Sequence, residues 1–122
     1  MMVGTVVNRR PTVPLTVRGP SGLEVAVEAA LDTGFNGFLT HPTLAVTSLG
    51  LPYRSHFRAG LADSSIIRLA VHAAVVMWDG AARDIEVLVA DRQPLLGTAL
   101  LSGYEVAIQF AEGGSITIEL LL

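Results

Sequence analysis

Hydrophobic and polar residues alternate along much of this chain, and the alternation predicts β-strands. Residues 23–28 read Leu-Glu-Val-Ala-Val-Glu, a pattern typical of a strand with one buried face. Residues 106–110 and 116–120 repeat the same spacing of apolar positions. We expect strands over residues 13–18, 23–31, 53–58, 67–78, 85–90, 106–110 and 116–120.

Turn residues separate these segments. Asp79-Gly80 joins two of the expected strands, and this pair tolerates the positive φ angles of a tight hairpin turn. Clusters of turn-forming residues predict three further hairpins, centred on Gly19-Pro20-Ser21-Gly22, on residues 62–65 and on Glu112-Gly113-Gly114.

Helix signals are few. Residues 98–103 form a candidate short helix between Thr98 and Gly103, and residues 43–49 form a candidate helix or turn. Many short strands at close spacing are typical of an antiparallel barrel or sandwich. The sequence therefore predicts one all-β domain over residues 1–122.

The high apolar content has two candidate explanations, a membrane segment or a large buried interface. Hydrophobic residues make up 51% of the 122 residues. The longest uncharged run, residues 33–53, contains prolines and several glycines, so it cannot satisfy its own backbone in lipid. Met1-Met2-Val3 lacks the basic and apolar regions of a signal peptide. We therefore expect no membrane contact and favour an interface.

Composition also excludes several chemistries. The chain has no cysteine, which excludes a thiol nucleophile and is compatible with a reducing, cytoplasmic location. Net charge is −3 and the basic residues are scattered apart from Arg9-Arg10, so nucleic-acid binding is not expected. His41, His56 and His72 lack metal-ligand spacing, and we expect neither a metal nor a cofactor.

One carboxylate stands out, because Leu31-Asp32-Thr33-Gly34 ends an expected strand with a Gly-containing loop. Two adjacent carboxyls can hydrolyse a peptide without metal, one as base towards water and one as acid towards the carbonyl oxygen. Their repulsion at ~3 Å and an effective dielectric of ~20 is about 5 kcal/mol, which keeps one proton shared between them. This chain has a single Asp-Thr-Gly, so the second carboxyl must come from a second chain.

Leu31-Asp32-Thr33-Gly34 and the later Leu95-Leu96-Gly97 together resemble the retropepsin-like (retroviral-type) aspartic proteases. Gly37-Phe38-Leu39-Thr40 and Trp78-Asp79-Gly80 resemble the bacterial and archaeal members of that group. The resemblance implies a closed acid-protease barrel with one short helix after Leu-Leu-Gly, assembled as a C2 homodimer. It also implies that Asp32 is catalytic, that Thr33 locks the two loops across the dimer, and that Gly34 keeps its backbone close to the carboxylate.

The resemblance further places a substrate-covering hairpin, the flap, at residues 53–71. Its expected substrate-contacting residues are Leu61, Ala62, Asp63, Ser64, Ser65 and Ile66, while Leu95, Leu96 and Gly97 are expected to support the catalytic loop.

Three positions depart from the family pattern. Phe35 replaces the usual Ala or Ser, so no serine hydroxyl reaches the aspartate. Asn36 and Thr98 replace an aspartate and an arginine that pair in many relatives. Because both charges are absent together, we expect a neutral contact in their place.

The sequence thus predicts a homodimeric aspartic endopeptidase that cleaves extended peptides, with Leu120-Leu121-Leu122 buried between subunits. Two alternatives remain open. One is a non-catalytic dimeric peptide-binding module with the same fold, and the other is a scaffold domain joined to a partner protein.

Overall fold

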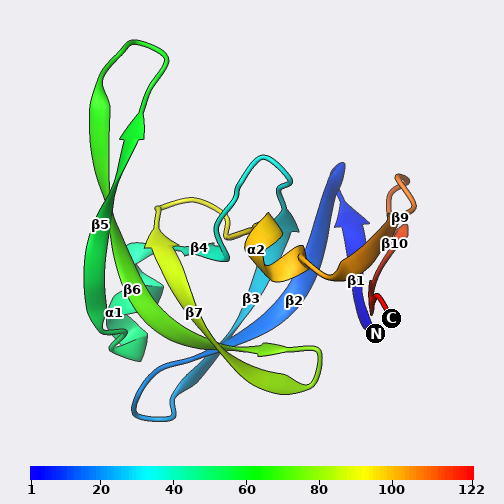
Figure 1. Cartoon of the computed structure of the whole chain (residues 1–122). Coiled ribbons are helices and arrows are strands. Elements are labelled where there is room, and N and C mark those ends of the chain that lie inside the picture. Colours follow the sequence, from blue (N-terminus) through cyan, green and yellow to red (C-terminus); the bar gives the residue numbers. More distant parts are fainter.

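The computed structural model describes all 122 residues and consists mostly of strands (Figure 1). This confirms the all-β prediction. The elements are β1 (Met2–Val7), β2 (Arg10–Arg18), β3 (Glu24–Leu31), β4 (Leu39–His41), α1 (Thr43–Leu49), β5 (Tyr53–Gly60), β6 (Ile66–Trp78), β7 (Ala81–Val89), β8 (Leu95–Leu96), α2 (Thr98–Leu101), β9 (Tyr104–Ile108) and β10 (Ser115–Leu120).

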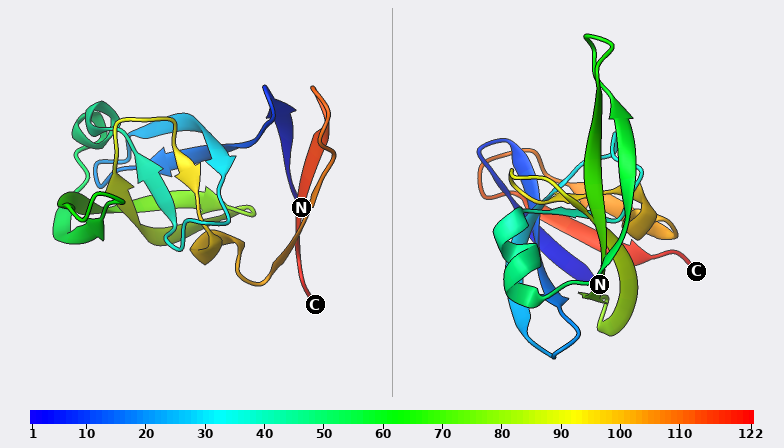
Figure 2. Two further views of the ribbon diagram at one scale, coloured as in Figure 1. Left: turned by 90° about the horizontal axis from the view of Figure 1, so that it is seen from above. Right: turned by 90° about the vertical axis from the view of Figure 1, so that its left-hand side faces the viewer.

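The strands form one sheet that closes on itself. Hydrogen-bonded neighbours follow the order β5-β6-β7-β4-β8-β3-β2-β1-β10-β9, and β2 also pairs with β6. This extra pairing closes β6, β7, β4, β8, β3 and β2 into a ring, which leaves β1, β10 and β9 as an outlying sheet beside it (Figure 2).

The core fills the ring because alternate positions of its strands point inward. On β2, Val13, Leu15 and Val17 are almost fully buried, as the alternation of this segment implies. Val76 of β6 and Val87 of β7 are completely buried in the same cluster. The outlying sheet adds Val6, Ile116 and Ile118 to the core.

Two hairpin turns have positive φ at both central residues. Asp79 and Gly80 adopt φ of 50° and 82°, as predicted for this pair. Asn8 and Arg9 adopt 50° and 63° between β1 and β2, a turn that the sequence did not predict. Arginine is not typical of a turn with positive φ, so the sequence does not indicate a hairpin here. Without the hairpin, the sequence does not predict β1.

Both candidate helices are present. Residues 43–49 form α1 with the predicted bounds, which adds a helix to the single one that the resemblance implied. The second, α2, ends at Leu101 rather than at Gly103. Neither is long enough or apolar enough to cross a membrane.

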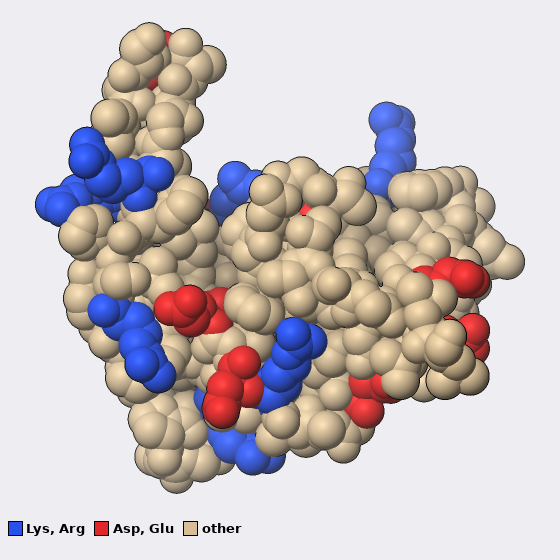
Figure 3. Space-filling view, in the orientation of Figure 1, with Lys and Arg blue, Asp and Glu red and all other residues tan.

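The β5–β6 hairpin extends away from the ring (Figures 1 and 2). Its strands pair from Tyr53↔His72 to Gly60↔Ile66, and almost every residue of β5 is exposed. Arginine side chains crowd its lower part on the face drawn in Figure 3. The hairpin predicted over this stretch is confirmed, and it packs on no other element near its tip.

The outlying sheet carries both chain termini and several exposed apolar residues. In the single chain Leu120, Leu121 and Leu122 are exposed, as are Val3 and Val7 of β1. Phe110 lies beyond the end of β9, which spans Tyr104–Ile108, so the strand predicted over residues 106–110 begins and ends two residues earlier than expected.

Candidate active site around Asp32

Asp32 is the first residue after β3, and β8 fixes its position. β8 lies between β3 and β4, parallel to the first and antiparallel to the second. The register places Leu31 beside Leu96, and the Asp32 amide donates to the Leu96 carbonyl at 3.0 Å. Asp32 therefore begins its loop at the edge of the closed ring, and this hydrogen bond holds it there.

Two backbone amides shape the turn that follows. The Gly34 amide donates to Asp32 Oδ1 at 2.9 Å, and the Phe35 amide donates to the Asp32 carbonyl at 3.1 Å. A Cβ at position 34 would lie 3.2 Å from Oδ1, so glycine keeps the amide close to the carboxylate. Oδ2 accepts no hydrogen bond from the chain and stays available to a second group.

The segment after β8 holds the other side of this loop. The Gly97 amide donates to the Phe38 carbonyl at 3.0 Å, and the Thr98 amide donates to the Phe35 carbonyl at 2.9 Å. A Cβ on Gly97 would meet the Gly37 carbonyl oxygen at 2.1 Å. The structure thus brings the predicted residues Asp32, Thr33 and Gly34 together with Leu95, Leu96 and Gly97.

Phe35, Asn36 and Thr98, which depart from the retropepsin-like pattern, lie where the Asp32 loop meets the segment after β8. The Thr98 hydroxyl donates to the Phe35 carbonyl at 3.4 Å, not to the Asn36 side chain. Asn36 and Thr98 nevertheless line one shallow hollow next to Thr33. A neutral backbone contact therefore stands where a charged pair would otherwise link the two segments.

Asp32 lines a pocket of about 440 Å³, which the sequence did not predict. We call it the Asp32 pocket, and its polar lining consists of Arg9, Arg10, Asp32, Arg92 and Gln93. Arg9 lies in the β1–β2 turn and Arg10 begins β2, whereas Arg92 and Gln93 precede β8. Arg9-Arg10 is the one pair of adjacent basic residues in the chain. The sequence shows the pair, but its position in the same pocket as Asp32 depends on the β1–β2 turn, which the sequence did not predict.

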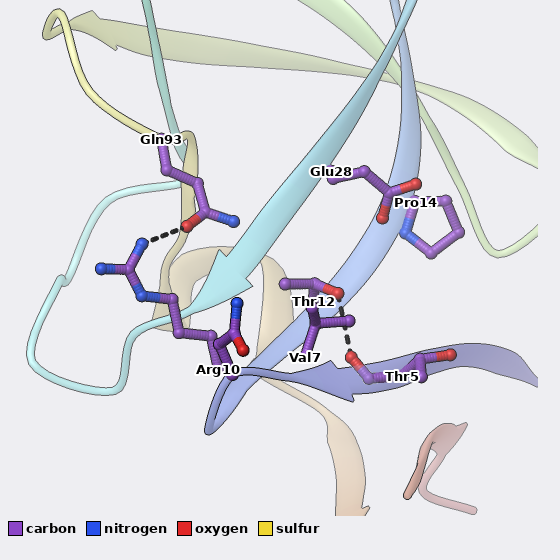
Figure 4. Close-up of a pocket in the computed structure, with 8 residues that line it drawn as sticks. Thr5, Val7, Arg10, Thr12, Pro14, Glu28 and Gln93 are labelled. Carbon is purple, nitrogen blue, oxygen red and sulfur yellow. Dashed lines mark hydrogen bonds between the residues drawn. The ribbon is translucent and has the colours of Figure 1, made fainter. Parts of the chain in front are cut away.

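A second hollow, of about 850 Å³, adjoins this pocket and shares Arg10 and Gln93 with it (Figure 4). Arg10 Nη1 donates to Gln93 Oε1 at 2.6 Å, which ties the β1–β2 turn to the segment before β8. Across the hollow, Glu28 of β3 supplies the only carboxylate of its lining.

The predicted flap residues do not approach Asp32 in the single chain. Residues 61–66 are all exposed and form the tip of the β5–β6 hairpin, which stands clear of the Asp32 loop (Figure 1). At that tip, Asp63 Oδ1 accepts the Ser65 amide at 2.9 Å, and its bonds to Ser65 lower the pKa of Asp63. The tip is thus a self-contained polar turn.

His41, at the end of β4, is fully buried, and burial lowers its pKa because the charged imidazolium loses its hydration. Neither ring nitrogen has a partner within the chain. No group of three or more His, Cys, Asp or Glu residues is placed to hold a metal ion. His41 is therefore a buried residue of the core.

No protein-family model matches the sequence, and no curated protein matches it significantly. The geometry around Asp32 is therefore the basis for assigning a function.

Proposed function

We propose that this chain is a retropepsin-like aspartic endopeptidase that acts as a symmetric homodimer. The observation that supports it most directly is the placement of Asp32. The residue follows β3, is braced by the Leu95-Leu96-Gly97 segment, and lines an open pocket, and its Oδ2 accepts no hydrogen bond from the chain. An aspartate in an ordinary turn would need neither the hydrogen bonds to a second segment nor an adjacent pocket.

In the proposed dimer, Asp32 of each chain lies close to the two-fold axis, where the two carboxyls share one proton. The ionised carboxylate takes a proton from water, and the protonated partner donates to the scissile carbonyl oxygen. Such a pair titrates as a unit because the two charges repel each other. The amide of Gly34 donates to Oδ1 and so fixes the orientation of the carboxyl group.

The outlying sheet supports a dimer of this kind. Several large apolar residues are exposed on it, including three consecutive leucines at the C-terminus, and a soluble monomer seldom exposes so many. The residues concerned are Val3, Val7, Phe110, Leu120, Leu121 and Leu122. A C2 partner would cover this surface with the same surface of its own.

The β5–β6 hairpin supplies the proposed substrate cover. β5 is an edge strand with unpaired backbone groups along one side, and an extended peptide can add to such an edge. Residues Leu61 to Ile66 would close over the peptide and exclude water from the reacting carbonyl.

Replacement of Asp32 by Asn tests the proposal. We expect wild-type protein to cleave a pool of denatured proteins between about pH 4 and 8, and Asp32→Asn to lose at least 10³-fold in rate, since the dyad loses its base. Asp84→Asn on β7 is the matched control, because Asp84 is an exposed carboxylate of the same size. Activity that survives in Asp32→Asn, or is absent from the wild type, overturns the peptidase assignment.

A non-catalytic dimeric peptide-binding module is the second candidate. The neutral Thr98–Phe35 contact and the phenylalanine at position 35 favour it, because both depart from the pattern of the active enzymes. It predicts that wild type and Asp32→Asn bind an extended peptide equally well and that neither cuts it. A chain that is monomeric by sedimentation and binds no peptide instead fits a scaffold domain joined to a partner.

A further inference from the structure

The distribution of arginine is uneven for an acidic protein. All eight basic residues are arginines, and three of them, Arg9, Arg10 and Arg92, line the Asp32 pocket. Asp32 is the only acidic residue in that lining. A pocket with three guanidinium groups and one carboxylate carries net positive charge, although the chain carries −3.

None of these three arginines has an ionic partner. The ion pairs of the chain are Arg18 with Glu24 and the N-terminal amine with Asp79. Asp91, next to Arg92 in sequence, instead accepts the Thr43 amide at 2.8 Å and the Thr43 hydroxyl at 3.1 Å. The single polar contact recorded for Arg10 is to the neutral Gln93 amide.

Arg9 is presented from a rigid turn. It adopts φ of 63°, a region that favours Gly or Asn over arginine. The preceding amide, that of Asn8, donates to Glu112 Oε2 at 3.0 Å and ties the turn to the β9–β10 connection. Strained backbone conformations cluster at functional sites, so Arg9 is a candidate for contact with a ligand in the pocket.

The β5–β6 hairpin adds positive charge on the same upper side of the molecule (Figure 3). Arg58 and Arg68 are direct cross-strand partners, a like-charge pair that disfavours the hairpin by itself. Arg68 Nη2 lies 2.6 Å from His56 Nε2, within hydrogen-bond distance, and has no acidic partner. Asp63, the one acidic residue of the hairpin, accepts hydrogen bonds from Ser65 at the tip and pairs with no arginine.

We propose that Arg9, Arg10 and Arg92 select extended peptides with Asp or Glu close to the bond that lies over Asp32. The proposal rests on the proposed function and names the substrate class of that site. The planar guanidinium fork matches a carboxylate with two parallel hydrogen bonds, which makes arginine selective for this group. A peptide is favoured over a nucleic acid because the chain as a whole carries −3 and no row of aromatic rings lines the pocket.

Matched peptides that differ only by Glu→Gln at one position near the centre test the selection. Cleavage rates are measured with the wild type, and binding is measured by fluorescence anisotropy in the Asp32→Asn background, where no peptide is consumed. We expect the Glu peptide to be cut and bound at least tenfold better than the Gln peptide, since a charge-assisted hydrogen bond contributes this much. The preference should weaken with added salt.

Arginine variants test which residues cause the preference for the Glu peptide. Arg92→Gln and Arg9→Asn should each bring the Glu/Gln ratio close to one, and asparagine keeps the φ that the β1–β2 turn requires. Arg18→Gln is the control, because it removes the same charge from the far end of β2. Thermal melts of each variant confirm that it is folded.

The outcomes separate the two proposals. Binding preference without cleavage rejects the peptidase and keeps the acidic-peptide selection. Cleavage without preference, or a preference that Arg18→Gln removes as much as Arg92→Gln, overturns the selection. So does an absence of peptide binding, or tighter binding of a single-stranded oligonucleotide than of the Glu peptide.

Discussion

Gly97 is the residue on which the Asp32 loop depends most closely. Its Cα lies against the Gly37 and Phe35 carbonyls, which a Cβ would meet at 2.1 and 2.7 Å. We expect Gly97→Ala to lower the free energy of unfolding by about 2–3 kcal/mol, because backbone must move to admit the methyl group. Urea unfolding measures the loss. Gly60→Ala, where the added Cβ meets nothing, should stay within about 0.5 kcal/mol of wild type; equal losses would contradict this.

His41 makes the stability of the fold depend on pH. Because its folded pKa lies below the ordinary 6.5, the unfolded chain binds more protons below that pH. Stability should therefore fall as pH decreases from about 6.5, by at most about 1.4 kcal/mol per pH unit, and level off below the folded pKa. Melting curves at several pH values should show a shallower decline for His41→Leu. Parallel curves would exclude His41 as the cause.

Arg9 illustrates a conflict between local conformation and charge. An ordinary residue in the left-handed region loses roughly 1–2 kcal/mol, whereas asparagine tolerates it better. Arg9→Asn should therefore raise the free energy of unfolding by up to about 1 kcal/mol while removing a charge from the Asp32 pocket. Urea denaturation at neutral pH measures the change. A loss of stability would mean that the arginine side chain, and not the turn, dominates.

At the level of elements, the short helix α1 is anchored from a distance. Pro42 at its N-cap provides no side-chain bond, and Asp91 from the segment after β7 accepts the Thr43 amide and hydroxyl instead. These bonds lower the pKa of Asp91, so they stabilise the fold above pH 3.8, the ordinary value, and are lost as pH falls through the folded value.

Asp91→Asn should therefore lower the melting temperature at pH 7, while wild type and variant converge near about pH 2, where the carboxyl is protonated. Calorimetry at both pH values makes the comparison. Asp84→Asn serves as the control, since Asp84 makes no hydrogen bond recorded in the structure. A constant difference at both pH values would indicate a packing effect and not a charged cap.

Elements that depend on interactions between residues close in sequence were predicted, whereas elements that depend on distant residues were not. Local alternation revealed β2, β3 and β10, and Asp79-Gly80 revealed the β6–β7 turn. β4 has only three residues and exists through its pairing with β7 and β8, far along the chain, so no local pattern indicates it. Asp32 and Leu95–Gly97 carried motifs of their own. The arginines of the pocket did not, because their placement depends on the unrecognised β1–β2 turn.

At the level of the whole molecule, the proposed activity depends on a second copy of the chain. Replacing Leu120, Leu121 and Leu122 by serine should weaken self-association by about tenfold or more for each leucine that the dimer buries, and peptidase activity should fall with it. Sedimentation across a concentration series measures the change. Leu44→Ser is the matched control, because Leu44 is 81% exposed on α1, away from the outlying sheet. An unchanged dimer would place the interface elsewhere.

The isolated position of the β5–β6 hairpin has a consequence for how the molecule opens. β5 shares hydrogen bonds with β6 alone and buries almost nothing, so few contacts are lost when the two strands part. Such a unit opens at a small fraction of the global unfolding energy. Its amide hydrogens should exchange with solvent deuterium far sooner than those of β2 or β3. A bound peptide should then slow exchange along β5 first, because the added strand would restore protection that the protein alone lacks.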